Sequence, residues 1–202
     1  MDLSAVIDFI AAHRAWALPL IFLVSFGESF AFLSLAIPGT TILAACGALV
    51  PGGTLSIWPL LAGAIPGAVL GDGISYWLGR RYGTAITGAW PLSRHPGMVE
   101  AGERFLRRHG WASVAIGRFF GPVRAVIPLV AGVAHMDRRQ FWIANVLSAF
   151  VWAPAVMLPG ALLGWAADRA DATEQWMMAG AVAAVAVVAG IVVLRRRRAG
   201  IK

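Results

Sequence analysis

Two arginines lie inside an almost wholly apolar stretch of the chain, AIGRFFGPVRAVIPLVAG, at residues 115–132. A charged side chain is costly inside a membrane segment, so an arginine at this depth indicates a functional site. On an unbroken helix Arg118 and Arg124 would point roughly 120° apart, because six residues turn about 600°. Gly121-Pro122 lies between them and Pro128 follows, and proline both removes a backbone donor and clashes with the preceding turn. We therefore expect a broken helix whose two arms direct both arginines toward one cavity.

A break at membrane depth predicts a re-entrant helical hairpin. Non-helical backbone in the hydrocarbon region is tolerated only where protein buries it or water fills an adjacent cavity. Guanidinium groups match the geometry of phosphate and carboxylate groups. The stretch therefore predicts an anion-binding hairpin with two fixed positive charges. The alternative is a cytoplasmic loop whose arginines only set the membrane topology.

The composition is that of an integral membrane protein. Hydrophobic residues make up 59% of the chain and charged residues 13%, whereas soluble domains carry about 25% charged residues. A length of 202 residues allows one domain of roughly four to six membrane segments. The net charge of +7 comes from clustered arginines, which indicates cytoplasmic loops and argues against nucleic-acid binding. The single cysteine excludes an internal disulfide, and the four histidines lack metal-ligand spacing.

The apolar runs divide the chain into three parts. Residues 1–14 read as an amphipathic helix lying in the membrane interface, although this helix can instead cross the membrane. Residues 15–166 form the membrane domain, in which the arginine-rich segment 80–110 is expected to be a cytoplasmic loop. Residues 167–202 are expected to supply a last transmembrane helix and a basic cytoplasmic tail.

A second interrupted apolar segment lies between Glu28 and Val50, where Pro38-Gly39 breaks the run. It would open to the outside if residues 55–78 run inward, whereas the hairpin of residues 112–135 opens to the inside. Two interrupted segments in corresponding halves of a chain point to a transporter site at mid-membrane. We therefore expect an all-α polytopic membrane protein with two opposed re-entrant hairpins, related as in an inverted repeat.

Glu28 is flanked by long apolar runs on both sides. An ionised carboxylate alone in that environment is costly, so Glu28 must be paired, hydrated or protonated. We expect it to exchange protons or to pair with Arg118 or Arg124. The alternative is a glutamate near the interface that contacts lipid headgroups.

Asp72 is a second carboxylate within an apolar span. It either lies near the two arginines or serves a local purpose, with candidate local partners Ser75, Tyr76 and Arg80. Asn145 and Ser148, in the span 141–166, could face the cavity, but hydrogen bonding between helices is the commoner use of such residues in membranes and is what we expect. No serine or histidine pattern of a known catalytic type is visible, so we do not expect an enzyme.

Three stretches of the chain resemble the DedA family of bacterial membrane proteins, part of the wider VTT-domain group. They are Glu28 followed by Pro38-Gly39; the residues Gly71-Asp72, Tyr76, Gly79-Arg80 and Gly83; and residues 117–132, which read G-R-F-x-G-P-x-R-x-x-x-P-x-x-A-G. The resemblance covers about residues 15 to 165 and implies the DedA/VTT fold in the bacterial cytoplasmic membrane. It maps the family's first acidic residue onto Glu28 and its two arginines onto Arg118 and Arg124. The family's second acidic residue usually follows the Pro-Gly directly, but this chain has Thr40 there, and Asp72 is the carboxylate that could replace it.

Members of this family resemble lipid translocases that recycle undecaprenyl phosphate or move phospholipids such as phosphatidylethanolamine, and several depend on the proton gradient. We therefore predict a proton-gradient-dependent flippase for a phosphate-bearing lipid headgroup, with membrane lipids and protons as partners and no cofactor. Undecaprenyl phosphate is the favoured cargo, because a phosphate monoester suits two arginines. Phosphatidylethanolamine is the alternative, since Glu28 could receive its amine. A proton-coupled transporter of a small ion or solute would use the same charges in a cavity closed to lipid.

Overall fold

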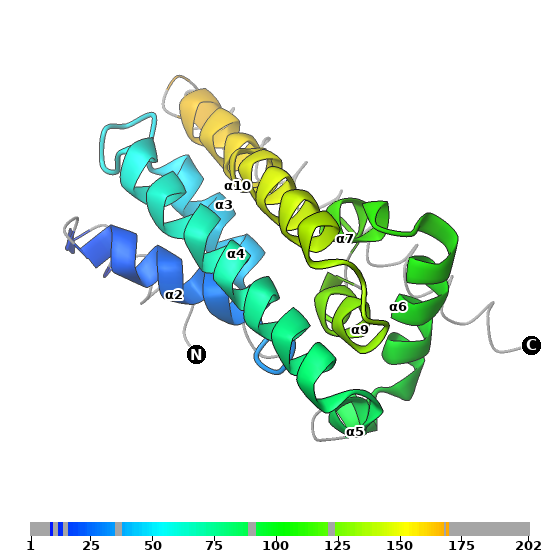
Figure 1. Ribbon diagram of the computed structural model, residues 1–202. Helices are drawn as coiled ribbons and strands as arrows, with labels where there is room; N and C mark the ends of the chain where they lie inside the picture. The colour runs from blue at the N-terminus through cyan, green and yellow to red at the C-terminus, as the bar shows by residue number, and fades with distance from the viewer. Residues whose placement is uncertain are drawn as a thin grey trace, which may run out of the picture.

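The computed structural model describes residues 9, 12–13, 16–34, 38–88, 92–120, 124–167 and 169, and every regular element among them is helical (Figure 1). Two long helices, α4 (Ile57–Tyr82) and α10 (Arg138–Ala167), run antiparallel to each other. The shorter helices are α2 (Ala17–Ser29), α3 (Gly39–Ala48), α5 (Thr84–Thr87), α6 (Pro96–His109), α7 (Ala112–Gly117) and α9 (Ile127–Val133), with a 3₁₀ turn, η2, at Leu92–Arg94. The segments expected at 1–14 and 167–202 lie, apart from a few residues, outside this described part.

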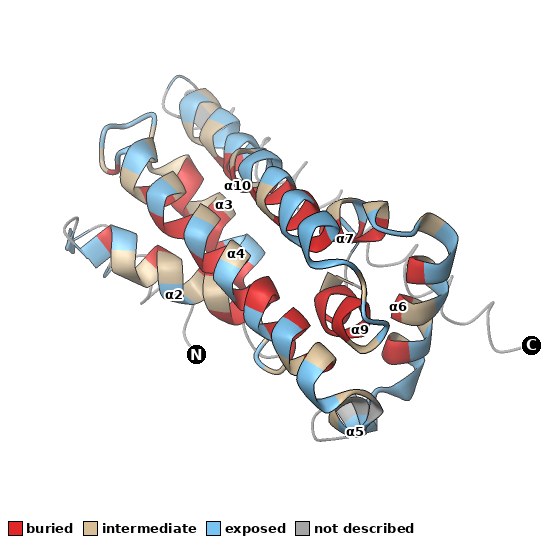
Figure 2. Ribbon diagram, viewed as in Figure 1, coloured by how far each residue is buried: buried red, intermediate tan, exposed pale blue. Residues whose placement is uncertain are grey.

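Helices α4 and α10 are the described helices that are long and apolar enough to cross a membrane. Their 26 and 30 residues correspond to about 39 and 45 Å, against roughly 30 Å of bilayer hydrocarbon. Figure 2 shows their outward faces exposed. Large apolar side chains occupy those faces: Leu70, Ile74 and Trp77 on α4, and Ile143, Leu147, Phe150, Val151, Leu158 and Leu162 on α10. Such faces suit lipid rather than water, and the spans expected at 55–78 and 141–166 are confirmed as helices.

None of the other described helices is long enough to cross a bilayer, and three of them are central to the site. Helices α3, α7 and α9 have 10, 6 and 7 residues, or about 15, 9 and 11 Å. Helix α3 begins directly after Pro38, so the break expected at Pro38-Gly39 is confirmed. Pro128 lies in the first turn of α9, where a missing backbone donor costs no hydrogen bond. Gly121 and Pro122 lie outside the described residues.

Glycines allow α2 to approach α4 closely. Three of them repeat every fourth residue on one face of α4, and a Cβ on each would collide with a carbonyl oxygen of α2. The glycines are Gly63, Gly67 and Gly71, and the carbonyls belong to Leu18, Phe22 and Phe26. Membrane helices often pack through such small residues, because backbones can then meet at van der Waals distance.

Each short helix that precedes a long helix packs on the other long helix. Helix α9, which precedes α10, packs on α4, where Gly79 and Gly132 face each other's helix backbone. Helix α3, which precedes α4, packs on α10, where Gly160 and Gly164 contact its backbone. The two packing sites lie at opposite ends of the α4–α10 pair (Figure 1).

The polar segment 80–110, expected to be a cytoplasmic loop, is mostly helical in its described part. Helix α4 continues through Tyr82 and ends at Gly83, whose φ of 58° suits glycine. Helix α6 then buries Val99 and Leu106. Its opposite face carries two exposed ion pairs between residues four apart, Glu100–Arg104 and Glu103–Arg107, each at 3.5 Å. The basic and acidic groups of α6 therefore lie on its exposed face.

Candidate functional site

Glu28 joins the first interrupted segment to the second. It lies at the end of α2, and Thr40 lies in the first turn of α3. The Thr40 hydroxyl donates a hydrogen bond to Glu28 Oε1, and Arg124 Nη1 donates to the same oxygen at 3.1 Å. A Cβ on Gly39 would collide with the Glu28 carboxylate, so glycine is what lets this carboxylate lie against the start of α3. Of the two arginines considered for Glu28, the structure pairs it with Arg124.

Arg118 forms a second ion pair. It caps the C-terminal end of α7, and its Nη2 donates to Asp72 of α4 and to the Asn145 side-chain oxygen of α10. Only 5% of Arg118 and 7% of Asp72 is exposed. Asp72 therefore pairs with an arginine, and in the described part of the chain it makes no hydrogen bond to Ser75, Tyr76 or Arg80. Ser75, one of those local candidates, instead donates to the Gly71 carbonyl at 2.9 Å.

Asn145 has a larger role than the sequence analysis gave it. Its Nδ2 donates to the Val69 carbonyl at 3.0 Å, which is the expected bond between helices. Its oxygen also accepts from Arg118, so the same amide holds an arginine against α4 and α10. Ser148 only donates to the Asn145 carbonyl within its own helix, at 3.0 Å.

Trp152 connects the two ion pairs. The guanidinium carbons of Arg118 and Arg124 lie 5.9 and 5.0 Å from the centroid of its ring. Trp152 is 2% exposed, so the ring offers both cations a dry aromatic face. Trp152 was not among the site residues expected from the sequence. The available signal was its position seven residues after Asn145, two turns along one helix face.

Several buried polar atoms of the site have no hydrogen-bond partner among the described residues. They are Nε and Nη1 of Arg118 and Oε2 of Glu28. Buried polar atoms are nearly always partnered, so each exception requires an explanation. Guanidinium nitrogens in this state are able to donate to an anion. The two ion pairs sum to zero charge when both carboxylates are ionised, so an anion would have to compete with Glu28 or Asp72 for the arginines.

The comparison with protein families identifies the family of this chain. The VTT domain family matches residues 37–162. This chain belongs to the VTT domain family. The matched range contains Thr40, Asp72, Arg118, Arg124 and Trp152, whereas Glu28 precedes it.

Two proteins of Escherichia coli are similar in sequence to this VTT-domain chain. Inner membrane protein YabI of Escherichia coli is 35% identical over 160 residues, which are 79% of this chain and 63% of YabI. Protein DedA of Escherichia coli is 25% identical over 197 residues, which are 95% of this chain and 89% of DedA. The chain thus spans less than two thirds of YabI. No solved structure matches it. The expected membership of the DedA/VTT group is confirmed, and the chain is a membrane protein of that group.

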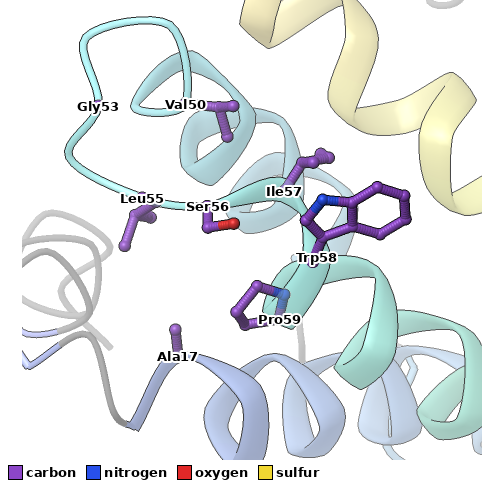
Figure 3. A pocket seen from close by; sticks show the side chains of 8 residues that line it. All are labelled: Ala17, Val50, Gly53, Leu55, Ser56, Ile57, Trp58 and Pro59. Atoms are coloured by element: carbon purple, nitrogen blue, oxygen red, sulfur yellow. The ribbon is translucent and has the colours of Figure 1, made fainter.

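A pocket elsewhere in the VTT-domain chain differs chemically from the site of the two ion pairs. It has a volume of about 470 Å³ and lies where the 50–56 turn meets the start of α4, beside Ala17 (Figure 3). Leu55, Ile57 and Trp58 line it, and the Ser56 hydroxyl and the Trp58 indole N–H are its polar side-chain groups. Without a charged side chain, this pocket lacks the groups that bind a phosphate. Among the described residues, no three His, Cys, Asp or Glu side chains are placed to share a metal ion.

Proposed function

We propose that this protein translocates a phosphate-bearing lipid headgroup across the membrane. One observation carries the proposal: the buried Arg118 and the half-buried Arg124, from different points of one interrupted segment, face the same tryptophan ring. In addition, Arg118 keeps two donor nitrogens without a partner among the described residues. A guanidinium group binds phosphate oxygens through paired, charge-assisted hydrogen bonds. Arg118 and Arg124 together would hold one phosphate between them.

The cargo that we favour is undecaprenyl phosphate. Its headgroup is a phosphate monoester, whose negative charge matches two guanidinium groups. Phosphatidylethanolamine is the alternative cargo, because it would bring an ammonium group as well as a phosphate. Glu28, whose Oε2 has no partner among the described residues, is the group that would accept that ammonium.

We propose that residues 17–48 and 112–133 form two re-entrant hairpins that enter the bilayer from opposite sides. The short length of α3, α7 and α9 supports this, as does the packing of α3 and α9 at opposite ends of the long helices. The arginine-rich end of α4 and the segment 80–110 would then face the cytoplasm, following the positive-inside rule. The headgroup would cross through the polar site while the lipid chain stays in hydrocarbon.

Glu28 is the group through which we expect protons to act. Arg118 donates to both an aspartate and an amide, whereas Arg124 donates to Glu28 and lies 3.5 Å from the Thr40 hydroxyl. Arg124 is thus the less firmly held of the two cations. Protonation of Glu28 would remove the negative charge that holds Arg124 and leave this arginine for the phosphate. Loss of the proton would restore the ion pair and release the headgroup.

A second function, proton-coupled transport of a small anion, is favoured by how closed the site is. The Arg118 and Arg124 side chains are only 3% and 14% exposed. A small anion would need less opening to reach them than a lipid headgroup with its chain. The same residues would serve either cargo, so the cargo must be measured directly.

The test is headgroup translocation in proteoliposomes made with the full chain. Undecaprenyl phosphate and phosphatidylethanolamine are assayed separately, each with the wild-type protein, Arg124→Ala and the surface control Arg104→Ala. We expect one lipid to move with wild type and Arg104→Ala but not with Arg124→Ala. If neither lipid moves while a small anion accumulates in the vesicles, the flippase proposal is wrong and the second function replaces it.

A further inference from the structure

A basic pocket lies at the C-terminal end of α4, apart from the buried ion pairs. It has a volume of about 290 Å³ and is lined by Trp77, Arg80, Arg81, His135 and Arg138. Its residues come from the end of α4, the turn between α9 and α10, and the start of α10. Arg80 follows Asp72 by eight residues, which is about 12 Å along the helix. The pocket is therefore a separate feature that the buried site does not explain.

His135 occupies a backbone position that normally favours glycine. Its φ is 54°, and it is the one non-glycine residue with positive φ in the described part of the chain. The turn closes α9 with two bonds, from His135 N–H to the Gly132 carbonyl at 2.9 Å and from Met136 N–H to the Ala131 carbonyl at 3.0 Å. Such a pair of bonds defines a Schellman motif, in which glycine is the usual residue at this position. An imidazole retained at conformational cost, on the edge of a basic pocket, indicates a use for the side chain.

Arg80 is held in place at the floor of the pocket. Its Nη1 donates to the Met136 carbonyl at 3.0 Å and to the Tyr76 hydroxyl at 3.1 Å, and Tyr76 itself donates to the same carbonyl at 2.6 Å. Arg81 and Arg138 are exposed beside it. The neighbouring carboxylate, Asp137, accepts from the Gln140 N–H at 3.1 Å and does not line the pocket. Three guanidinium groups therefore converge without a carboxylate among the lining side chains.

We propose that this pocket binds the phosphate group of an anionic phospholipid at the membrane surface. Clustered arginines next to membrane helices attract anionic headgroups, and basic pockets between such helices bind them. An apolar path leads away from the pocket along α4, where Leu70, Ile74 and Trp77 are all exposed. These residues are spaced four and three apart and share one helix face. Acyl chains lying on that face favour a membrane lipid over a soluble phosphate compound. The site does not depend on whether Arg118 and Arg124 carry cargo.

The test measures lipid retention by native mass spectrometry on the full chain in a neutral detergent. Binding of phosphatidylglycerol is compared with binding of phosphatidylcholine. Inorganic phosphate and glycerol 3-phosphate are titrated as soluble phosphate compounds that lack acyl chains. The pocket variant is Arg81→Gln/Arg138→Gln. The matched control is Arg104→Gln/Arg107→Gln, which removes the same charge from the exposed face of α6.

We expect wild type and the control to retain phosphatidylglycerol equally, and the pocket variant to bind it about 30-fold more weakly. His135→Gly keeps the turn but removes the imidazole, so it should weaken retention severalfold while leaving the protein at least as stable to heat. Equal loss in pocket variant and control would overturn the proposal. So would saturation by inorganic phosphate or glycerol 3-phosphate at the affinity of the lipid, which would make the ligand a soluble phosphate. Arg124→Ala should retain the lipid as wild type does. If this variant loses the lipid, the retained lipid binds at Arg118 and Arg124 and not at the basic pocket.

Discussion

Arg124 donates a hydrogen bond to the Glu28 carboxylate at 3.1 Å, across 96 residues of chain. The contact joins the two interrupted segments of the fold at one point, because Glu28 ends α2 and Arg124 lies between α7 and α9. Their side chains are 9% and 14% exposed, so water screens the pair very little. Removing either partner would leave the other charge in a nearly dry environment, which is costly.

Arg124→Ala should slow transport strongly while the protein still inserts and folds. The substitution removes a charge-assisted contact to the transported anion, a loss expected to slow transport about 10- to 100-fold. Arg124→Lys keeps the charge but not the planar fork, so its transport rate should fall between wild type and alanine. Initial rates in proteoliposomes measure both effects, and equal rates for lysine and wild type would show that the fork is not used.

The Asp72–Arg118 pair should matter for stability as well as transport. Asp72→Asn alone leaves Arg118 buried without its counter-charge, and breaking a buried pair costs about 3–5 kcal/mol. The double variant Asp72→Asn/Arg118→Gln removes both charges and should regain most of the melting temperature lost, yet remain inactive. Thermal unfolding in detergent measures this.

The control for this pair is Glu100→Gln, which breaks the ion pair between Glu100 and Arg104. The side chains of these two residues are 65% and 62% exposed. Exposed pairs contribute about 0–1 kcal/mol, so this control should melt close to wild type. A double variant that is no more stable than Asp72→Asn would contradict the assignment of Asp72 and Arg118 as a pair.

Much of the architecture could be predicted from residue types and their spacing. Apolar runs of sufficient length predicted the long helices α4 and α10, and Pro38-Gly39 predicted the start of α3. Arg118 and Arg124 are six positions apart, and the Gly121-Pro122 break between them predicted that both would turn toward one cavity. In the structure both guanidinium groups lie over one ring.

The pairing of charges could not be predicted, because it depends on contacts between distant parts of the chain. Arg118 and Asp72 are 46 residues apart, and either arginine was a possible partner for Glu28. Asn145 was equally ambiguous, since an amide can bond a neighbouring helix or an arginine, and here it does both. Trp152 carries no charge, so only its position on the same helix face as Asn145 pointed to the site.

Gly39→Ala should disable the site without altering a charged residue. A Cβ at this position would lie 2.9 Å from Glu28 Cβ and would collide with its carboxylate, which must then move away from Arg124. We expect a loss of transport of about tenfold or more, as for losing that charge-assisted contact. The matched control is Gly97→Ala on α6, where a Cβ meets nothing within 4 Å. Alanine should be neutral or slightly stabilising in that helix. Transport by Gly39→Ala at the rate of Gly97→Ala would show that the position of the Glu28 carboxylate is unimportant.

Glu28→Gln should uncouple transport from protons. Glutamine keeps the size of the side chain and an oxygen that accepts from Thr40 and Arg124, but it cannot gain or lose a proton in the working range. Transport should therefore continue at a reduced rate, with no stimulation by a proton gradient and a flat dependence on pH. Glu100→Gln, exposed on α6, should keep the wild-type pH profile. Both are measured as initial rates in proteoliposomes with and without an imposed gradient. A wild-type pH profile in Glu28→Gln would place the coupling proton on another group, and Asp72, the other buried carboxylate of the site, would be the next to substitute.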